Sequence, residues 1–88
     1  MKIVSIIIPN YNGKDLLHNC IDSIYSNISI DNFEIIVVDN ASTDNSVQNI
    51  QTLFPDVVIV SNKENAGYSG GCNIGAKHAK GKYLIFLN

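Results

Sequence analysis

The sequence lacks the features that mark several large protein classes. Six basic residues against eight acidic ones give a formal net charge of −2, so the chain offers no basic surface for the phosphates of a nucleic acid. Its apolar runs are short, and none approaches the roughly 18–20 residues needed to cross a bilayer. We therefore expect no nucleic-acid partner and no transmembrane segment within these 88 residues.

Cysteine and histidine are scarce and widely spaced. Cys20 and Cys72 lack the spacing of metal ligands and give only one possible disulfide pair. We interpret them as buried thiols of a protein in a reducing compartment. His18 and His78 are isolated as well, and we assign them surface or packing roles. Neither a zinc-type site nor a disulfide framework is predicted.

Four short apolar runs rich in β-branched or aromatic residues are present. They resemble strands that are buried on both faces of a parallel sheet. Between them, apolar residues recur with helical spacing, as in Leu17, Cys20, Ile21 and Ile24. The order βαβαβαβ predicts right-handed crossovers and a Rossmann-like, three-layer α/β half-domain with parallel strand order 3-2-1-4. The predicted strands are Ile3–Ile8, Ile35–Val38, Val57–Val60 and Tyr83–Leu87.

Polar residues and glycine predict where the helices begin and end. Asn12 is the expected cap of the first helix, with Asp15 completing an imperfect capping box. Candidate caps of the second helix are Ser42, Thr43 and Asp44. The third helix is expected over residues 69–80, followed by Gly81 in the left-handed conformation.

Ligands of such sheets bind beyond the carboxyl ends of the strands. The first of these ends reads PNYNG, with a single glycine and a bulky tyrosine. It therefore lacks the G-x-G-x-x-G turn of dinucleotide-binding domains, and the Walker pattern is absent from the chain. The paired acids that a receiver-type domain carries at the end of its first strand are absent as well.

Asp39 directly follows the run EIIVV, at the carboxyl end of the second predicted strand. A carboxylate there can accept a hydrogen bond from the N3–H of uracil or thymine, or from ribose hydroxyls. It can equally form an Asx turn ahead of the next helix. Its position alone leaves both interpretations open, whereas Asp44 is assigned to the helix start.

Three segments together resemble a known family. VSIIIPNYNG, EIIVVDNASTDNS and NAGYSGGCNIGAKHAKGKYLIFLN are similar, in this order and spacing, to the start of inverting family 2 glycosyltransferases with the GT-A fold. The third segment is most similar to the branch that includes rhamnosyl- and galactofuranosyl-transferases. The resemblance implies that residues 1–88 form the N-terminal, nucleotide-sugar-binding part of such a domain, incomplete at its C-terminus.

The resemblance also implies a set of site residues. The residues assigned to the nucleotide sugar are Pro9, Tyr11, Asn12, Asp39, Asn40, Ser42, Asn65, Gly67 and Asn73. Asn88 matches the first position of the family's metal motif, whose ligating aspartate would follow it. The implied cofactor is Mg²⁺ or Mn²⁺, since hard divalent ions suit phosphate and carboxylate oxygens.

The resemblance further implies a function for the longer protein and a limit for this part. It predicts transfer of a sugar from a nucleoside-diphosphate sugar to a hydroxyl of a glycan or lipid-linked acceptor, in polysaccharide biosynthesis in the cytoplasm or at the cytoplasmic face of a membrane. The family's metal aspartate and general base lie outside the matched segments. We therefore expect these 88 residues to recognise the nucleotide, to hold no metal and to be inactive alone.

Two other functions compete with this reading. One is a non-catalytic Rossmann-like module that binds a nucleotide or a protein partner. The other is a nucleotidyltransferase, which usually has a glycine-rich, basic loop where this chain has PNYNG.

The end of the sequence and its glycines carry two more expectations. KGKYLIFLN ends on an apolar strand, which we read as the truncated edge of a larger domain and as a site of self-association. Gly67, Gly71, Gly75 and Ala79 recur every fourth residue. On a helix they would form a smooth stripe that packs closely against the sheet beneath a sugar nucleotide, with Asn65 and Asn73 as polar contacts.

Overall fold

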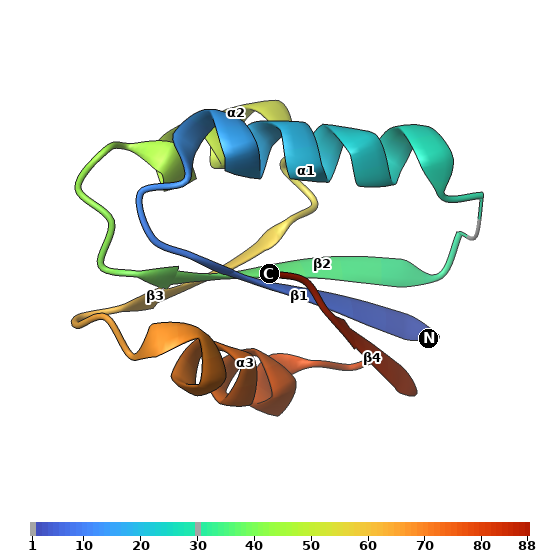
Figure 1. Ribbon diagram of the computed structural model, residues 1–88. Coiled ribbons are helices and arrows are strands. Elements are labelled where there is room, and N and C mark those ends of the chain that lie inside the picture. Colours follow the sequence, from blue (N-terminus) through green and yellow to red (C-terminus); the bar gives the residue numbers. More distant parts are fainter. Residues whose placement is uncertain (1, 30) are drawn as a thin grey trace.

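The computed structural model describes residues 2–29 and 31–88. All pairings between strands are parallel, and the order in the sheet is β3-β2-β1-β4. Helices α1 and α2 cover one face of the sheet and α3 covers the other (Figure 1). The predicted fold class, element order and strand order are confirmed. The elements are β1 Val4–Asn10, α1 Lys14–Asn27, β2 Phe33–Asn40, α2 Ser46–Leu53, β3 Val58–Asn62, α3 Gly67–His78 and β4 Tyr83–Phe86.

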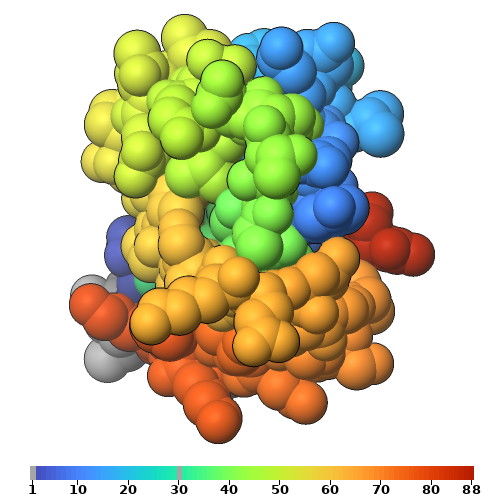
Figure 2. Space-filling view, turned by 90° about the vertical axis from the view of Figure 1, so that its left-hand side faces the viewer, coloured from blue at the N-terminus to red at the C-terminus, as the bar shows by residue number. Residues whose placement is uncertain are grey.

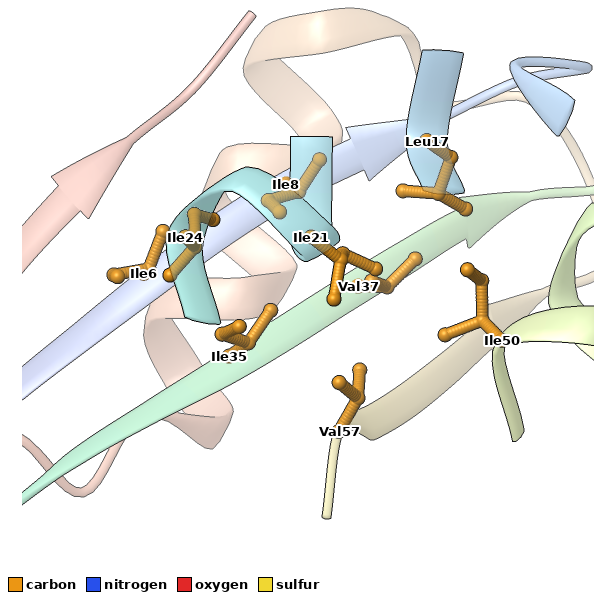
Figure 3. Packing of buried hydrophobic residues seen from close by; sticks show 9 residues of the cluster. All are labelled: Ile6, Ile8, Leu17, Ile21, Ile24, Ile35, Val37, Ile50 and Val57. Atoms are coloured by element: carbon orange, nitrogen blue, oxygen red, sulfur yellow. The ribbon is translucent and has the colours of Figure 1, made fainter. Parts of the chain in front are cut away.

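The two central strands carry the core because both of their faces are covered. Alternate side chains of β1 and β2 point to opposite faces, so both strands contribute to two hydrophobic clusters, one on each face of the sheet. The larger cluster lies between the sheet and helices α1 and α2 (Figure 3). The smaller one consists of Ile7, Ile36 and Val38 beneath α3. The larger cluster contains Ile6, Ile8, Leu17, Ile21, Ile24, Ile35, Val37, Ile50 and Val57.

Glycine lets α3 lie directly on the sheet, as its sequence spacing predicts. A Cβ atom on Gly71 would lie 2.9 Å from the Pro9 Cβ, and one on Gly75 would overlap the Cγ2 of Ile7. Both glycines are buried. Gly67 is not packed against the sheet, because the space around it is open. Its φ of +72° is the reason why glycine is favoured at this position. The stripe is therefore a packing surface over its central part.

The predicted helix starts are wrong in detail. Gly13, rather than Asn12, is the N-cap of α1, and it makes no side-chain capping bond. Asn45, with φ of 63°, precedes α2, and Asp44 Oδ1 accepts the N–H of Ser46 at 3.0 Å. Asn12, in the loop after β1, instead bonds to Ser42 and Thr43 in the loop after β2. These tertiary contacts replace the predicted capping.

The ends of α3 also differ from the prediction. The helix begins at Gly67, two residues early, and its C-cap is Ala79. Gly81 lacks the expected positive φ. A Cβ atom there would lie 2.5 Å from the backbone nitrogen of Ser5, so close approach to β1 explains this glycine.

Strand β4 lies at the edge of the sheet, paired with β1. Its four residues are 40–58% exposed. In the part of the chain that the structure describes, no helix is long and apolar enough to cross a membrane.

Candidate functional site

The carboxyl ends of β1, β2 and β3 meet the start of α3 at one edge of the molecule. Figure 2 looks onto this edge, with the loop after β2 in green, the start of α3 in orange and the C-terminal residues in red. A cavity of about 230 Å³ opens there. It is lined by Pro9, Asn10, Tyr11, Asn40, Asn65, Gly67, Tyr68 and Asn88.

Asp39 is held by a hydrogen-bonded cluster on the α1 side of this edge. Its Oδ1 accepts Asn10 Nδ2 at 3.0 Å and the Ser42 hydroxyl at 2.6 Å. Its Oδ2 accepts the Ser42 N–H at 3.1 Å. With 7% of its surface exposed, Asp39 lies behind the cavity wall and is not among the lining residues. These bonds give Asp39 a loop-forming role and leave Oδ2 with spare accepting capacity, while its assignment to the nucleotide stays a prediction.

Asn12 ties the loop after β1 to the loop after β2. Its N–H donates to Ser42 Oγ at 2.9 Å, and its Oδ1 accepts the N–H of Thr43 at 2.8 Å. Its φ of 51° lies in the left-handed region, which asparagine tolerates better than most residues. Ser42 Oγ also accepts Asn10 Nδ2 at 3.2 Å, so Ser42 links Asp39, Asn12 and Asn10. Neither Asn12 nor Ser42 lines the cavity.

Asn40 organises the α3 side of the same edge. Its Oδ1 accepts Asn62 Nδ2 at 2.8 Å and the Ala66 N–H at 3.3 Å, and its Nδ2 donates to the Gly67 carbonyl at 3.2 Å. The side chain is 3% exposed. A buried amide with both ends satisfied fixes its surroundings, so Asn40 holds the entry of α3 against β2 while also lining the cavity.

The asparagines of the glycine-rich segment have different positions. Asn65 is exposed, lines the cavity and accepts the Gly67 N–H at 2.8 Å through Oδ1. Asn73 is exposed on α3 and does not line the cavity. The assignment of Asn73 to the nucleotide sugar stays a prediction.

Two lining residues were missed by the sequence analysis. Asn10 is the last residue of β1 and was treated only as part of a turn, although it is 5% exposed and bonded to Asp39. Its sequence signal is that Ile8 and Asn10 share a face in a strand. Tyr68 is 45% exposed at the start of α3. Its pKa is raised, mainly by a hydrogen bond with Cys72 and to a smaller extent by partial desolvation.

The cavity wall is polar but carries no ionisable acid or base other than tyrosine among the residues that line it. Amides offer both donors and acceptors, and tyrosine rings offer apolar faces. Such a wall suits an uncharged ring with polar edges, such as a nucleobase or a sugar. It offers no cation to neutralise a diphosphate.

The residues present do not form a metal site. Within residues 2–29 and 31–88, no group of three or more His, Cys, Asp or Glu side chains could hold an ion. Asn88 is exposed at the cavity and would offer one amide oxygen. Its assignment to a metal motif stays a prediction.

Sequence comparison identifies the family. The family model described as glycosyl transferase family 2 matches residues 5–88. A poly(ribitol-phosphate) beta-glucosyltransferase of Bacillus spizizenii is 38% identical over 93 residues, which cover all of this chain and 14% of that protein. The chain spans 12–35% of the length of the curated relatives it matches.

Solved structures agree. A mannosyltransferase from Pyrobaculum calidifontis in complex with GDP-Man and Mn²⁺ is 32% identical with a TM-score of 0.79, over 92% of this chain and 25% of that one. The Staphylococcus aureus protein TarS, residues 1–349 with UDP, is 27% identical with a TM-score of 0.85, over 99% of this chain and 27% of that one. The chain therefore belongs to glycosyltransferase family 2.

Proposed function

We propose that this chain is the donor-binding part of an inverting GT-A glycosyltransferase, which transfers a sugar from a nucleoside-diphosphate sugar to an acceptor hydroxyl. One observation carries the proposal: the amide- and tyrosine-lined cavity lies at the carboxyl edge of the parallel sheet, where such sheets bind ligands. Support comes from the neighbouring structures, whose ligands are GDP-Man and UDP.

The lining residues have distinct roles in this proposal. The Tyr11 ring, 54% exposed, offers a face for the nucleobase, with Pro9 beside it. Asp39 Oδ2 retains an accepting site for a base N–H or a ribose hydroxyl that reaches past the rim. Asn65 offers its amide to the sugar side of the nucleotide. Asn40, Asn12 and Ser42 act by shaping this surface.

The diphosphate needs charge that these residues do not supply. A divalent cation stabilises the negative charge that develops on the leaving diphosphate, and Mn²⁺ accompanies GDP-Man in the Pyrobaculum structure. Asn88 and the other described residues do not complete such a site. We expect nucleotide binding by this chain without sugar transfer.

Calorimetric titration with UDP, dTDP and GDP in the presence of Mn²⁺ tests the proposal. We expect weak binding of one of them, and loss of affinity in Tyr11→Ala, because a stacked base contributes about 1–3 kcal/mol. Tyr83→Ala is the matched control, because Tyr83 is equally exposed but lies at the start of β4 and does not line the cavity.

Two results would overturn the proposal. Tyr11→Ala binding as tightly as the parent chain would remove the assigned site. Absence of binding both by this chain and by a longer protein that contains it would remove the function. Nucleotide binding by that longer protein without transfer to any glycan or lipid-linked acceptor would favour a non-catalytic module.

A further inference from the structure

A buried carboxylate lies at the opposite end of the sheet from the cavity. Glu34, near the start of β2, is 8% exposed. Its Oε2 accepts the Ser5 hydroxyl at 2.6 Å and the backbone N–H of Lys80 at 2.7 Å. Burying an ionised group is costly unless it is hydrogen-bonded, and these two bonds offset that cost while tying Glu34 to β1 and to the segment after α3.

Ser5 makes a similar contact with Gly81, which follows Lys80 in the segment between α3 and β4. It is fully buried in β1, and its Oγ accepts the N–H of Gly81 at 2.8 Å. Glu34 and Ser5 thereby hold two consecutive backbone N–H groups of the segment between α3 and β4. Gly81 lies so close to β1 that a Cβ atom would be 2.5 Å from the Ser5 nitrogen. We call Glu34, Ser5, Lys80 and Gly81 the β4 clamp.

The clamp acts where β4 has little other support. The strand pairs with β1 alone among the described strands, and its side chains are 40–58% exposed. Its flanking backbone bonds run from Tyr83 N–H to the Ile3 carbonyl at 2.9 Å and from Leu87 N–H to the Ile7 carbonyl at 3.0 Å. If the segment between α3 and β4 were not held in place, β4 could shift along β1.

We propose that Glu34 is a positioning residue that fixes the register of β4 on β1 and thereby places Asn88 in the wall of the nucleotide cavity. Asn88 follows β4 directly and lines that cavity. Figure 1 shows β4 running from the clamp end of the sheet toward the C-terminus. The inference rests on the proposed function only for the identity of the ligand.

Two variants test the clamp. Glu34→Gln keeps the size and an acceptor oxygen but replaces charge-assisted hydrogen bonds with neutral ones, which are roughly half as strong. Ser5→Ala removes the acceptor of the Gly81 N–H with little change in volume. Asp22→Asn is the control, because it removes the same charge from an exposed position of α1.

Amide hydrogen exchange followed by NMR gives the first measurement. We expect the Tyr83 and Leu87 amides to exchange about tenfold faster in Glu34→Gln and Ser5→Ala, with α1 amides unchanged within about twofold. Acceleration of α1 and β4 amides together would mark a general loss of stability and would overturn the positioning role. If Glu34→Gln fails to fold, Ser5→Ala decides by the same pattern.

The second measurement concerns Asn88 and the ligand. We expect the Asn88 resonances to shift in both variants, and the Kd for the bound nucleoside diphosphate to rise at least about threefold. Unchanged Asn88 resonances and Kd would overturn the proposal even if β4 exchanges faster. If neither the parent chain nor a longer protein that contains it binds a nucleotide, the proposed function fails, and the β4 exchange and Asn88 shifts still decide for or against the clamp.

Discussion

The Asn10 side-chain nitrogen lies 3.0 Å from Oδ1 of Asp39. The two residues are partners in the register of β1 and β2, and both are at least nine-tenths buried. Parallel strands in register bring their last polar residues side by side. The side-chain amide of Asn10, the last residue of β1, therefore orients the Asp39 carboxylate of β2.

This pair predicts strong coupling between the two positions. Asn10→Ala and Asp39→Ala should each lower the free energy of unfolding by about 1–3 kcal/mol, because each removes a hydrogen bond between a buried amide and a buried carboxylate. The double variant should cost less than the sum, with a coupling energy of about 0.5–3 kcal/mol. Urea denaturation of the four proteins measures it. Asn49→Ala, at an exposed position of α2, is the control, and strict additivity would contradict the pairing.

Close packing of α3 predicts a different sensitivity. Gly75→Ala should lower the free energy of unfolding by about 1–3 kcal/mol, because the added methyl group meets Ile7 and lies 3.1 Å from Val38 Cγ2. Alanine otherwise favours a helix over glycine, so destabilisation would come from packing alone. Asn73→Ala, exposed on the same helix, should change it by less than about 0.5 kcal/mol. A stabilised Gly75→Ala in thermal melts would contradict the close approach.

The buried Glu34 predicts a loss of stability in acid. Burial raises its pKa, but the Ser5 hydroxyl, the Lys80 N–H and the charges of Lys80 and Lys2 outweigh this and hold the pKa below its ordinary value of 4.5. A carboxyl whose folded pKa is depressed stabilises the fold above its unfolded pKa, and this contribution is lost as the pH falls through the folded pKa.

Comparison of the parent chain with Glu34→Gln isolates that contribution. Denaturation midpoints of the two proteins should differ most near pH 6 and converge as the pH falls below about 4. Asp31 and Asp56 line the same cavity as Glu34, and Asp44 also has a lowered pKa, mainly through its bond with Ser46. These acids are present in both proteins. A difference that stays constant from pH 6 to pH 3 would contradict the assignment.

The fold could be predicted from the sequence because its signals are local and repeated. Runs such as Ile35–Val38 are short and β-branched, which favours strands buried on both faces, and the helical spacing of Leu17, Ile21 and Ile24 predicts a helix with one apolar face. For a given strand order, the right-handedness of the crossovers decides which face of the sheet each helix covers. The glycine stripe of α3 was equally readable, because close approach requires the absence of side chains at fixed spacing.

The site was less predictable because its contacts join residues far apart in sequence. Asn12 reads as a helix cap, yet its amide binds Thr43 across two loops. Asn40 reads as a ligand contact, yet it is buried and holds the entry of α3. Glu34 carries no local signal, since its partners Ser5 and Lys80 are 29 and 46 residues away. Hydrogen bonds between polar residues that are so far apart in sequence have no local sequence signal, and only the folded structure shows them.

The exposed edge strand predicts self-association of this chain. Ile85 and its three neighbours in β4 are apolar and half-exposed, and an unpaired strand edge offers backbone groups to another chain. Light scattering at increasing concentration should show dimers or larger species in the parent chain. Ile85→Lys should return it to the monomer, because a charge on an edge strand opposes pairing. Leu16→Lys, which places the same charge on a more exposed apolar position of α1, should not. A parent chain that stays monomeric at the highest concentration would contradict the prediction, as would equal effects of the two lysine variants.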